Sequence, residues 1–124
     1  MFAPSGPFAG VSYYDIINDL TDLFSYSQSD VAAAGWVYNI RTSNSGGLDG
    51  SSMQWPILVM RAAKDLWGLD TPAIVLDRTA AGFRALQNSS GTGNGGIGYR
   101  SNTQWLNGAK TGGALVCWNS VGLD

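Results

Sequence analysis

Apolar residues recur at helical spacing in four segments of the chain, and the first of these begins at Tyr13. Its apolar positions follow one another at intervals of three and four residues: Tyr13, Ile16, Ile17, Leu20, Leu23 and Phe24. This spacing places side chains on one face of an α-helix. Ser12, followed three positions later by Asp15, has the pattern of a capping box. Together they predict a helix that starts at residue 13.

A second helix is predicted from about Ser52 to Trp67, with Gly68 as its stop. Pro56 removes one backbone donor, so the helix either begins nearer Gln54 or bends at the proline. We expect its inward face to carry six apolar residues: Trp55, Leu58, Val59, Ala62, Ala63 and Leu66.

The third predicted helix opens after Asp70-Thr71-Pro72, which has the pattern of a cap followed by a proline at the first helical position. Its inward face is predicted to comprise Val75, Leu76, Thr79, Phe83 and Leu86. The linkers on either side of these helices, 39–50 and 88–102, are rich in Gly, Ser, Asn and Thr, as turns require. No segment has the alternation of a strand, so the pattern predicts an all-α protein.

The fourth predicted helix runs from Trp105 to Val121 and differs from the others in its many small residues. Glycine within a helix costs about 1 kcal/mol relative to alanine. A face made of small residues lets another helix approach closely. We therefore expect an interface at Gly108, Ala109, Gly112 and Gly113.

The helices also form an internal repeat. A shift of 59 residues places Phe24 on Phe83 and Gln28 on Gln87, and a shift of 61 places the segment 35–38 on the segment 96–99. The chain is thus interpreted as one domain, 1–124, with repeats over about 12–68 and about 71–122. Helical repeats bury one another's faces and usually need three or more units, so we expect a two-repeat chain to associate.

These repeats resemble a known family. Phe83-Arg84-Ala85-Leu86-Gln87, a glycine-rich turn and Gly95-Gly96-Ile97-Gly98-Tyr99 are similar to the QW-type repeat of the prenyltransferase and squalene-cyclase superfamily, in its bacterial, often uncharacterised members. The segments 35–38 and 49–58 resemble the same repeat. The resemblance implies an α/α-toroid, of which this chain holds an incomplete part. It also implies that the motif residues are structural staples at helix ends: Gln28, Trp36, Tyr38, Gln87, Gly96 and Tyr99.

The residues that this superfamily uses for catalysis are missing. The chain has no histidine and no glutamate, so a Ser-His-Asp site, a Cys-His site and a histidine-bound zinc are excluded within it. The nearest match to the Asp-x-Asp-Asp acid of hopene-type cyclases is Asp19-Leu20-Thr21-Asp22, which we interpret as a solvated helix face. Cys117 is interpreted as a small buried hydrophobe. We predict no catalytic residue, no metal and no cofactor.

Charge and hydropathy limit the kinds of partner and the location that we expect for the chain. Charged residues are 13% of the chain, the formal net charge is −2, and no basic stripe exists for nucleic acid. No stretch approaches the ~18 apolar residues of a membrane span. Low charge, few lysines and many Ser, Asn and Gly residues favour the cell exterior. Trp55 and Trp105 are candidates to line a site for an apolar small molecule, although core packing explains most aromatic residues more simply.

These observations predict a non-catalytic α/α-repeat protein that acts as a structural or protein-interaction module, with other copies of itself or other protein chains as partners. Two alternatives to this interpretation stay open. In the first, the chain is part of a triterpene-cyclase-like enzyme whose catalytic acid lies outside it. In the second, the chain is a module that binds an apolar ligand.

Overall fold

The computed structural model describes residues 1–38 and 47–121, and within these ranges the chain folds into four helices without a strand. They are α1 (Tyr13–Ser27), α2 (Gln54–Trp67), α3 (Ala73–Leu86) and α4 (Gly108–Ser120). The predicted all-α class is confirmed. Part of the predicted 39–50 linker and the last residue of the predicted second repeat lie outside the described residues. No helix in the described part is long and apolar enough to cross a membrane.

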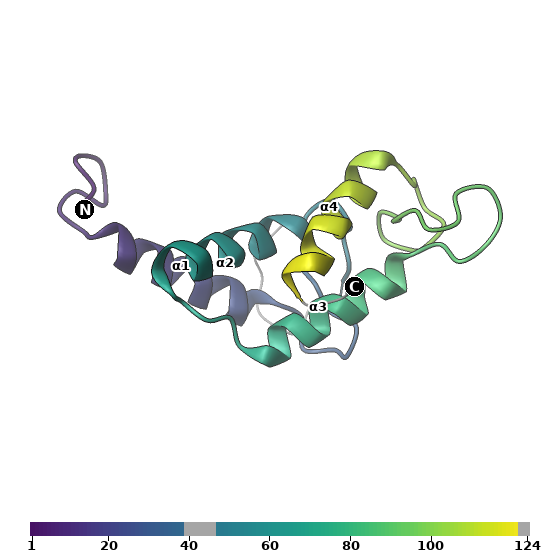
Figure 1. Cartoon of the computed structure of the whole chain (residues 1–124), viewed down its shortest axis with the longest axis horizontal. Coiled ribbons are helices and arrows are strands. Elements are labelled where there is room, and N and C mark those ends of the chain that lie inside the picture. Colours follow the sequence, from purple (N-terminus) through teal and green to yellow (C-terminus); the bar gives the residue numbers. More distant parts are fainter. Residues whose placement is uncertain (39–46, 122–124) are drawn as a thin grey trace.

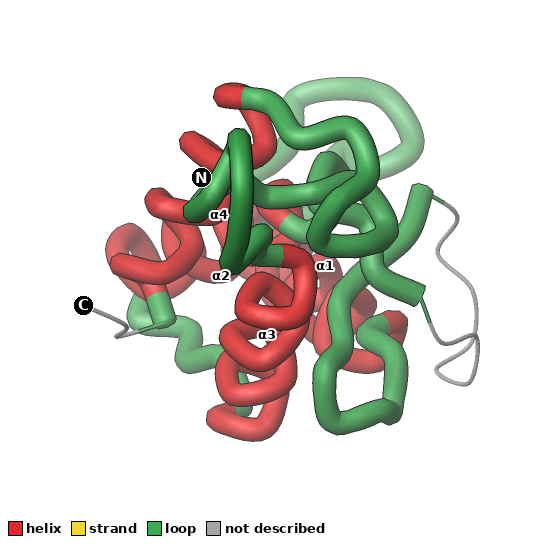
Figure 2. The backbone as a smooth tube through the Cα atoms, turned by 90° about the vertical axis from the view of Figure 1, so that its right-hand side faces the viewer, coloured by secondary structure: helices red, strands yellow, loops and turns green. Residues whose placement is uncertain are grey.

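Helices α1 and α2 run antiparallel, because Tyr13 at the start of α1 lies beside Trp67 at the end of α2. Helix α4 packs on α2, where the Cys117 Sγ lies 3.8 Å from the Gln54 carbonyl oxygen. The N-terminal loop and the loop between α3 and α4 lie at opposite ends of the molecule (Figure 1). Seen along the long axis, the helices gather to one side and much of the loop structure to the other (Figure 2).

Local signals set most helix ends as predicted. The Ser12 Oγ accepts a hydrogen bond from the Asp15 backbone N–H at 3.1 Å, so Ser12 caps α1. Gly68 ends α2 in the left-handed region, with φ +69°, which glycine adopts without steric cost. Helix α3 begins one residue later than predicted. Pro72 has ψ 133° and serves as the cap itself, because its carbonyl accepts from the Val75 N–H at 2.9 Å.

The predicted start of the fourth helix at Trp105 is wrong. The Asn107 Oδ1 accepts a hydrogen bond from the Lys110 N–H at 3.0 Å, so the cap fixes the first helical residue as Gly108. Trp105 lies before this cap with φ +46°, outside the helical region. Apolar periodicity extends the predicted helix three residues too far, because the asparagine cap at residue 107 carries no apolar signal.

The core lies where α2, α3 and α4 meet, and Met53 is its tightest contact. Met53 lies at the end of the turn before α2, fully buried beside two glycines, Gly35 and Gly82. A Cβ atom added to Gly35 would come within 2.6 Å of the Met53 sulfur, so only glycine fits there without a shift of the methionine. The remaining large members of the core come from all three helices and the two loops: Trp36, Ile57, Met60, Val75, Phe83, Leu86, Ile97 and Cys117.

The predicted inward face of α2 is also wrong for most of its members. Trp55 is 63% exposed and Leu66 is 69% exposed, while Ile57 and Met60 are buried. At 3.6 residues per turn, α2 carries two apolar faces on opposite sides, and the core covers the one that includes Ile57. The uncovered face is called here the outer stripe of α2, and it comprises four exposed residues: Trp55, Leu58, Ala62 and Leu66.

Helix α1 has the fewest fully buried residues of the four helices. Ser27, at its end, is its one buried residue within the described structure. Ile16, Ile17 and Leu20 are half-buried, and Leu23 is exposed. The predicted apolar face of α1 therefore contacts the rest of the molecule only in part. By contrast, the predicted face of α3 is covered as expected, with Val75, Thr79, Phe83 and Leu86 all buried.

Candidate functional site

The end of α1 is held by two buried side chains of the repeat motif. The amide Nε2 of Gln28 donates hydrogen bonds to the Val75 carbonyl oxygen and to the Thr79 Oγ1, both at 2.9 Å. The Trp36 indole Nε1–H donates to the Phe24 carbonyl oxygen at 2.9 Å. That carbonyl belongs to the last turn of α1, where backbone acceptors have no partner within the helix. Gln28 thus joins α1 to α3, and Trp36 satisfies the open end of α1.

The matching residue of the second repeat, Gln87, behaves differently. Its backbone has the same extended conformation at a helix end, and the turns that follow also match. Ser29 N–H donates to the Gly35 carbonyl at 3.3 Å, and Asn88 N–H donates to the Gly96 carbonyl at 2.8 Å. The half-buried Gln87 amide, however, makes no hydrogen bond to any part of the chain that the structure describes. Of the two predicted staples, Gln28 therefore bonds α3, whereas Gln87 makes no equivalent bond to the described residues.

A buried acid, Asp49, shapes the turn before α2 that contacts both motif tyrosines, and the sequence reasoning did not single it out. Its Oδ1 accepts hydrogen bonds from the Ser51 and Ser52 N–H groups at 2.9 and 3.2 Å. Its Oδ2 has no hydrogen-bond partner within the part of the chain that the structure describes. The carboxylate nevertheless raises the pKa of Tyr99, chiefly as an acceptor near the phenol. The Tyr38 hydroxyl lies 3.2 Å from the Ser51 Oγ.

This Asp49 turn has a recognisable sequence signal. Asp-Gly-Ser-Ser immediately before a helix is typical of an Asx turn, in which the aspartate accepts N–H groups two and three residues on. Gly50 in this turn approaches the second repeat directly, since its N–H donates to the Tyr99 carbonyl oxygen at 2.8 Å. The arrangement fixes two loops against each other, and its carboxylate is fully buried.

An aromatic groove lies between the end of α1 and the start of α2. It has a volume of 190 Å³, and its walls are Phe24, Trp36, Val37, Tyr38, Ser52, Trp55 and Pro56. Sites for drug-sized ligands usually have about 300–1,000 Å³, so this groove is closer to the size of one or two side chains. Trp55 belongs both to this groove and to the outer stripe of α2, so the two features are continuous.

The predicted small-residue interface lies on α4 with three of its four members turned outward. Gly108, Ala109 and Gly112 are exposed, and the space beside both exposed glycines is open. Gly113 instead turns inward against the Gln54 side chain, so it does not belong to that outer face. Two exposed apolar residues of the last turns, Leu115 and Val116, extend the outer face of α4.

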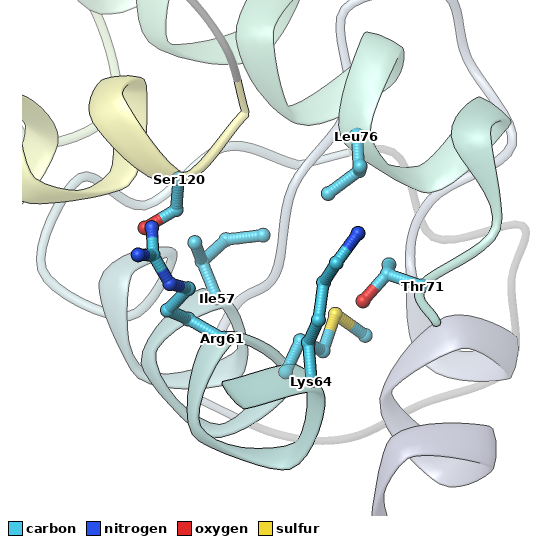
Figure 3. A pocket seen from close by; sticks show the side chains of 7 residues that line it. Ile57, Arg61, Lys64, Thr71, Leu76 and Ser120 are labelled. Carbon is cyan, nitrogen blue, oxygen red and sulfur yellow. The ribbon is translucent and has the colours of Figure 1, made fainter. Parts of the chain in front are cut away.

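A smaller pocket between α2, the start of α3 and the end of α4 contains two basic side chains (Figure 3). Lys64 and Arg61 extend from α2 toward Thr71 and Ser120, above a floor that includes Ile57. Its 60 Å³ is room for about two water molecules. Both bases already have partners, Asp65 for Arg61 at 2.6 Å and Asp70 for Lys64 at 3.0 Å. The pocket is therefore a solvated crevice between helix ends.

The structure does not bring the two candidate ligand-lining tryptophans together in the groove. Trp55 forms one wall of it, whereas Trp105 packs on Tyr99 with the ring centroids 5.4 Å apart.

The carboxylates of Asp15, Asp19 and Asp22 are exposed, as the sequence predicts for a solvated face. Cys117 is buried as predicted, and burial raises the pKa of its thiol to about 12. Within residues 1–38 and 47–121, no group of His, Cys, Asp or Glu is arranged to hold a metal.

No protein-family model, curated protein or solved structure matches this chain.

Proposed function

We propose that this chain is a non-catalytic assembly module, which joins other copies of itself or other protein chains through the outer stripe of α2. The observation that carries the proposal is the exposed apolar character of this stripe. Arg61 and Asp65 lie beside it, but no charged residue interrupts it. Contiguous exposed apolar surface of this kind marks interaction sites in soluble proteins.

The stripe offers apolar surface whose burial would favour association. Full burial of a large apolar side chain contributes about 1.5–3 kcal/mol. Trp55 and Leu66 are each more than half exposed, and Leu58 is more than a third exposed. Burial of these three residues would contribute several kcal/mol, part of which offsets the entropy lost when two chains associate.

The aromatic groove at one end of the stripe can accommodate a side chain of the partner. Tryptophan and tyrosine are enriched among the residues that dominate binding energy at protein interfaces, particularly where they form pockets. Trp36, Tyr38 and Trp55 supply such walls at one end of the stripe. We expect an apolar side chain of the partner to enter the groove while its helix lies along Leu58, Ala62 and Leu66.

An α/α-toroid architecture is part of the same proposal. The two turns after Gln28 and Gln87 have matching backbone hydrogen bonds, which supports two related hairpins. In a helical repeat, each hairpin buries a face against its neighbour. The outer stripe of α2 and the outer face of α4 would then be the faces on which further hairpins pack.

The groove favours one second candidate, a module that binds a small apolar ligand. Its walls are mainly aromatic and aliphatic, and Ser52 contributes a single hydroxyl. At 190 Å³ it suits a ligand of a few carbon atoms more than a triterpene. A role as part of a cyclase would require an acid from another chain or segment, since Asp19 and Asp22 are exposed.

Sedimentation equilibrium tests the assembly proposal. We expect the weight-average mass to rise above the single-chain 13.1 kDa as the concentration increases from about 1 μM to about 1 mM, the range of weak to moderate association. The variant carrying both Leu58→Gln and Leu66→Gln should return the mass toward 13.1 kDa, because it places amides in the apolar contact.

Ile74→Gln is the matched control, since Ile74 is 55% exposed but lies on α3, away from the stripe. It should leave the mass unchanged. A single-chain mass at every concentration would contradict assembly with copies of the chain, and an equal effect of Ile74→Gln would contradict the role of α2. A small apolar probe such as cyclohexanol that binds the wild type but not Trp55→Ala would support the second candidate.

A further inference from the structure

Trp105 is held in a backbone conformation that a bulky residue rarely adopts. Its φ of +46° is the one positive value outside glycine in the described part of the chain. This conformation costs free energy, and such outliers cluster at functional sites. The indole gains little burial in return, because Trp105 is 69% exposed. A strained and exposed tryptophan points to a use outside the folded core.

The ring of Trp105 forms a fixed ledge with Tyr99. Their centroids are 5.4 Å apart with the planes tilted by 33°. The loop is closed by the hydrogen bond from the Tyr99 N–H to the Gln104 carbonyl oxygen at 2.7 Å. The Gly50 N–H donates to the Tyr99 carbonyl oxygen at 2.8 Å, so the ledge is attached to the turn that precedes α2.

The charges around this ledge select against ionic ligands. Between Arg84 and Lys110, the chain carries one charged residue, Arg100. The Arg100 guanidinium lies 5.3 Å from the centroid of the Tyr99 ring, where a ligand cation would otherwise bind. One arginine is also too few for the backbone of a nucleic acid, which requires several cationic contacts.

Apart from Arg100, the exposed neighbouring groups are neutral and able to form hydrogen bonds. Exposed Ser101, Asn102 and Thr103 form the turn before Trp105. Immediately after it, Leu106 and Asn107 line an open hollow of 530 Å³, together with several glycines, Asn94 and Thr111. An apolar ledge bordered by amides, hydroxyls and exposed backbone suits a ligand that has an apolar face and hydroxyl edges.

We propose that Trp105 and Tyr99 form a binding site for a neutral carbohydrate. The C–H face of a pyranose ring would stack on the indole, and its hydroxyls would bond to the surrounding Ser, Asn and Thr side chains. This site does not use the outer stripe of α2, so it is independent of the proposed assembly function.

Titration with cellohexaose and, separately, with maltohexaose tests the site, with tryptophan fluorescence and calorimetry as readouts. We expect saturable binding of at least one of them and a loss of roughly tenfold or more in affinity for Trp105→Ala. Trp67→Ala is the matched control, because Trp67 is 38% exposed at the end of α2 and belongs to neither the outer stripe nor the groove. Its affinity should stay within about twofold of the wild type.

Trp105→Gly separates a binding role from a structural one, because glycine accepts a positive φ. We expect Trp105→Gly to keep or raise the melting temperature and to abolish binding. A clear fall in the melting temperature would show that Trp105 serves the fold, and would overturn the proposal. Absence of saturable binding to both oligosaccharides at about 10 mM, or equal loss in Trp67→Ala, would overturn it as well.

Discussion

Gln28 and Gln87 occupy matching helix ends, yet only the amide of Gln28 is used. Gln28→Ala removes two buried hydrogen bonds, to Val75 and Thr79, and should lower the free energy of unfolding by about 1–3 kcal/mol. Gln87→Ala should change it by less than about 0.5 kcal/mol, because the half-buried Gln87 amide makes no hydrogen bond to the described residues. Urea unfolding monitored by circular dichroism measures both. Equal losses would show that Gln87 has a partner beyond the described contacts.

Burial of the Cys117 thiol makes stability depend on pH in the alkaline range. The folded pKa of about 12 lies above the ordinary value of 9.0, so the folded state holds its proton more tightly. The stability that the protonated Cys117 thiol contributes to the folded state is complete below pH 9 and is lost as the pH rises toward 12. The free energy of unfolding should fall by roughly 1 kcal/mol per pH unit in that interval.

Cys117→Ala serves as the reference for this pH dependence, because every other titrating group is retained. The difference in unfolding free energy between wild type and Cys117→Ala should be constant from about pH 6 to pH 9. Above pH 9 the wild type should lose stability steadily relative to Cys117→Ala. A difference that stays constant up to pH 11 would contradict a buried, protonated thiol.

At the scale of the helix, the two adjacent glycines of α4 face different surroundings. Gly112 borders open space, whereas Gly113 faces the Gln54 side chain. Gly112→Ala should stabilise the isolated chain by about 0.5–1 kcal/mol through helix propensity. Gly113→Ala should gain less or lose stability, since Gln54 must move. Thermal unfolding of both variants tests this. A larger gain in melting temperature for Gly113→Ala would contradict the assignment of Gly113 to the inner face and Gly112 to the outer face of α4.

Most helix ends were predictable from the sequence, the start of α4 excepted, but helix faces were predictable only in part. Ser12 and Gly68 act through bonds within a few residues, so their sequence signals suffice. The buried side of α2 depends on which of two apolar faces meets α3 and α4, and this is decided by contacts distant in the sequence. The carboxylate of Asp49 was overlooked for the same reason, because its burial depends on the second repeat and on Tyr99.

Across the whole molecule, the helices differ in how much of their surface is buried in the core. Helix α1 buries little of its surface, while Ile57, Phe83 and Cys117 join the other three helices in the core. Local opening free energies follow such differences in burial. We expect the amides of residues 17–23 in α1 to exchange with deuterium well before those of residues 79–86 in α3, under conditions where global unfolding is negligible. Uniform protection across both helices would show that the chain opens only as one unit.

Met53 and its two glycines imply a rule for how related sequences diverge. The three atoms nearest to a Cβ at Gly35 all belong to the Met53 side chain, so we expect a larger residue at 35 to be accepted if position 53 becomes smaller. A Cβ at Gly82 meets the Ala34 backbone carbonyl as well, which no side-chain change removes. Positions 35 and 53 should therefore covary in homologous chains, through compensating exchanges of volume, while position 82 stays glycine whatever residue stands at 53.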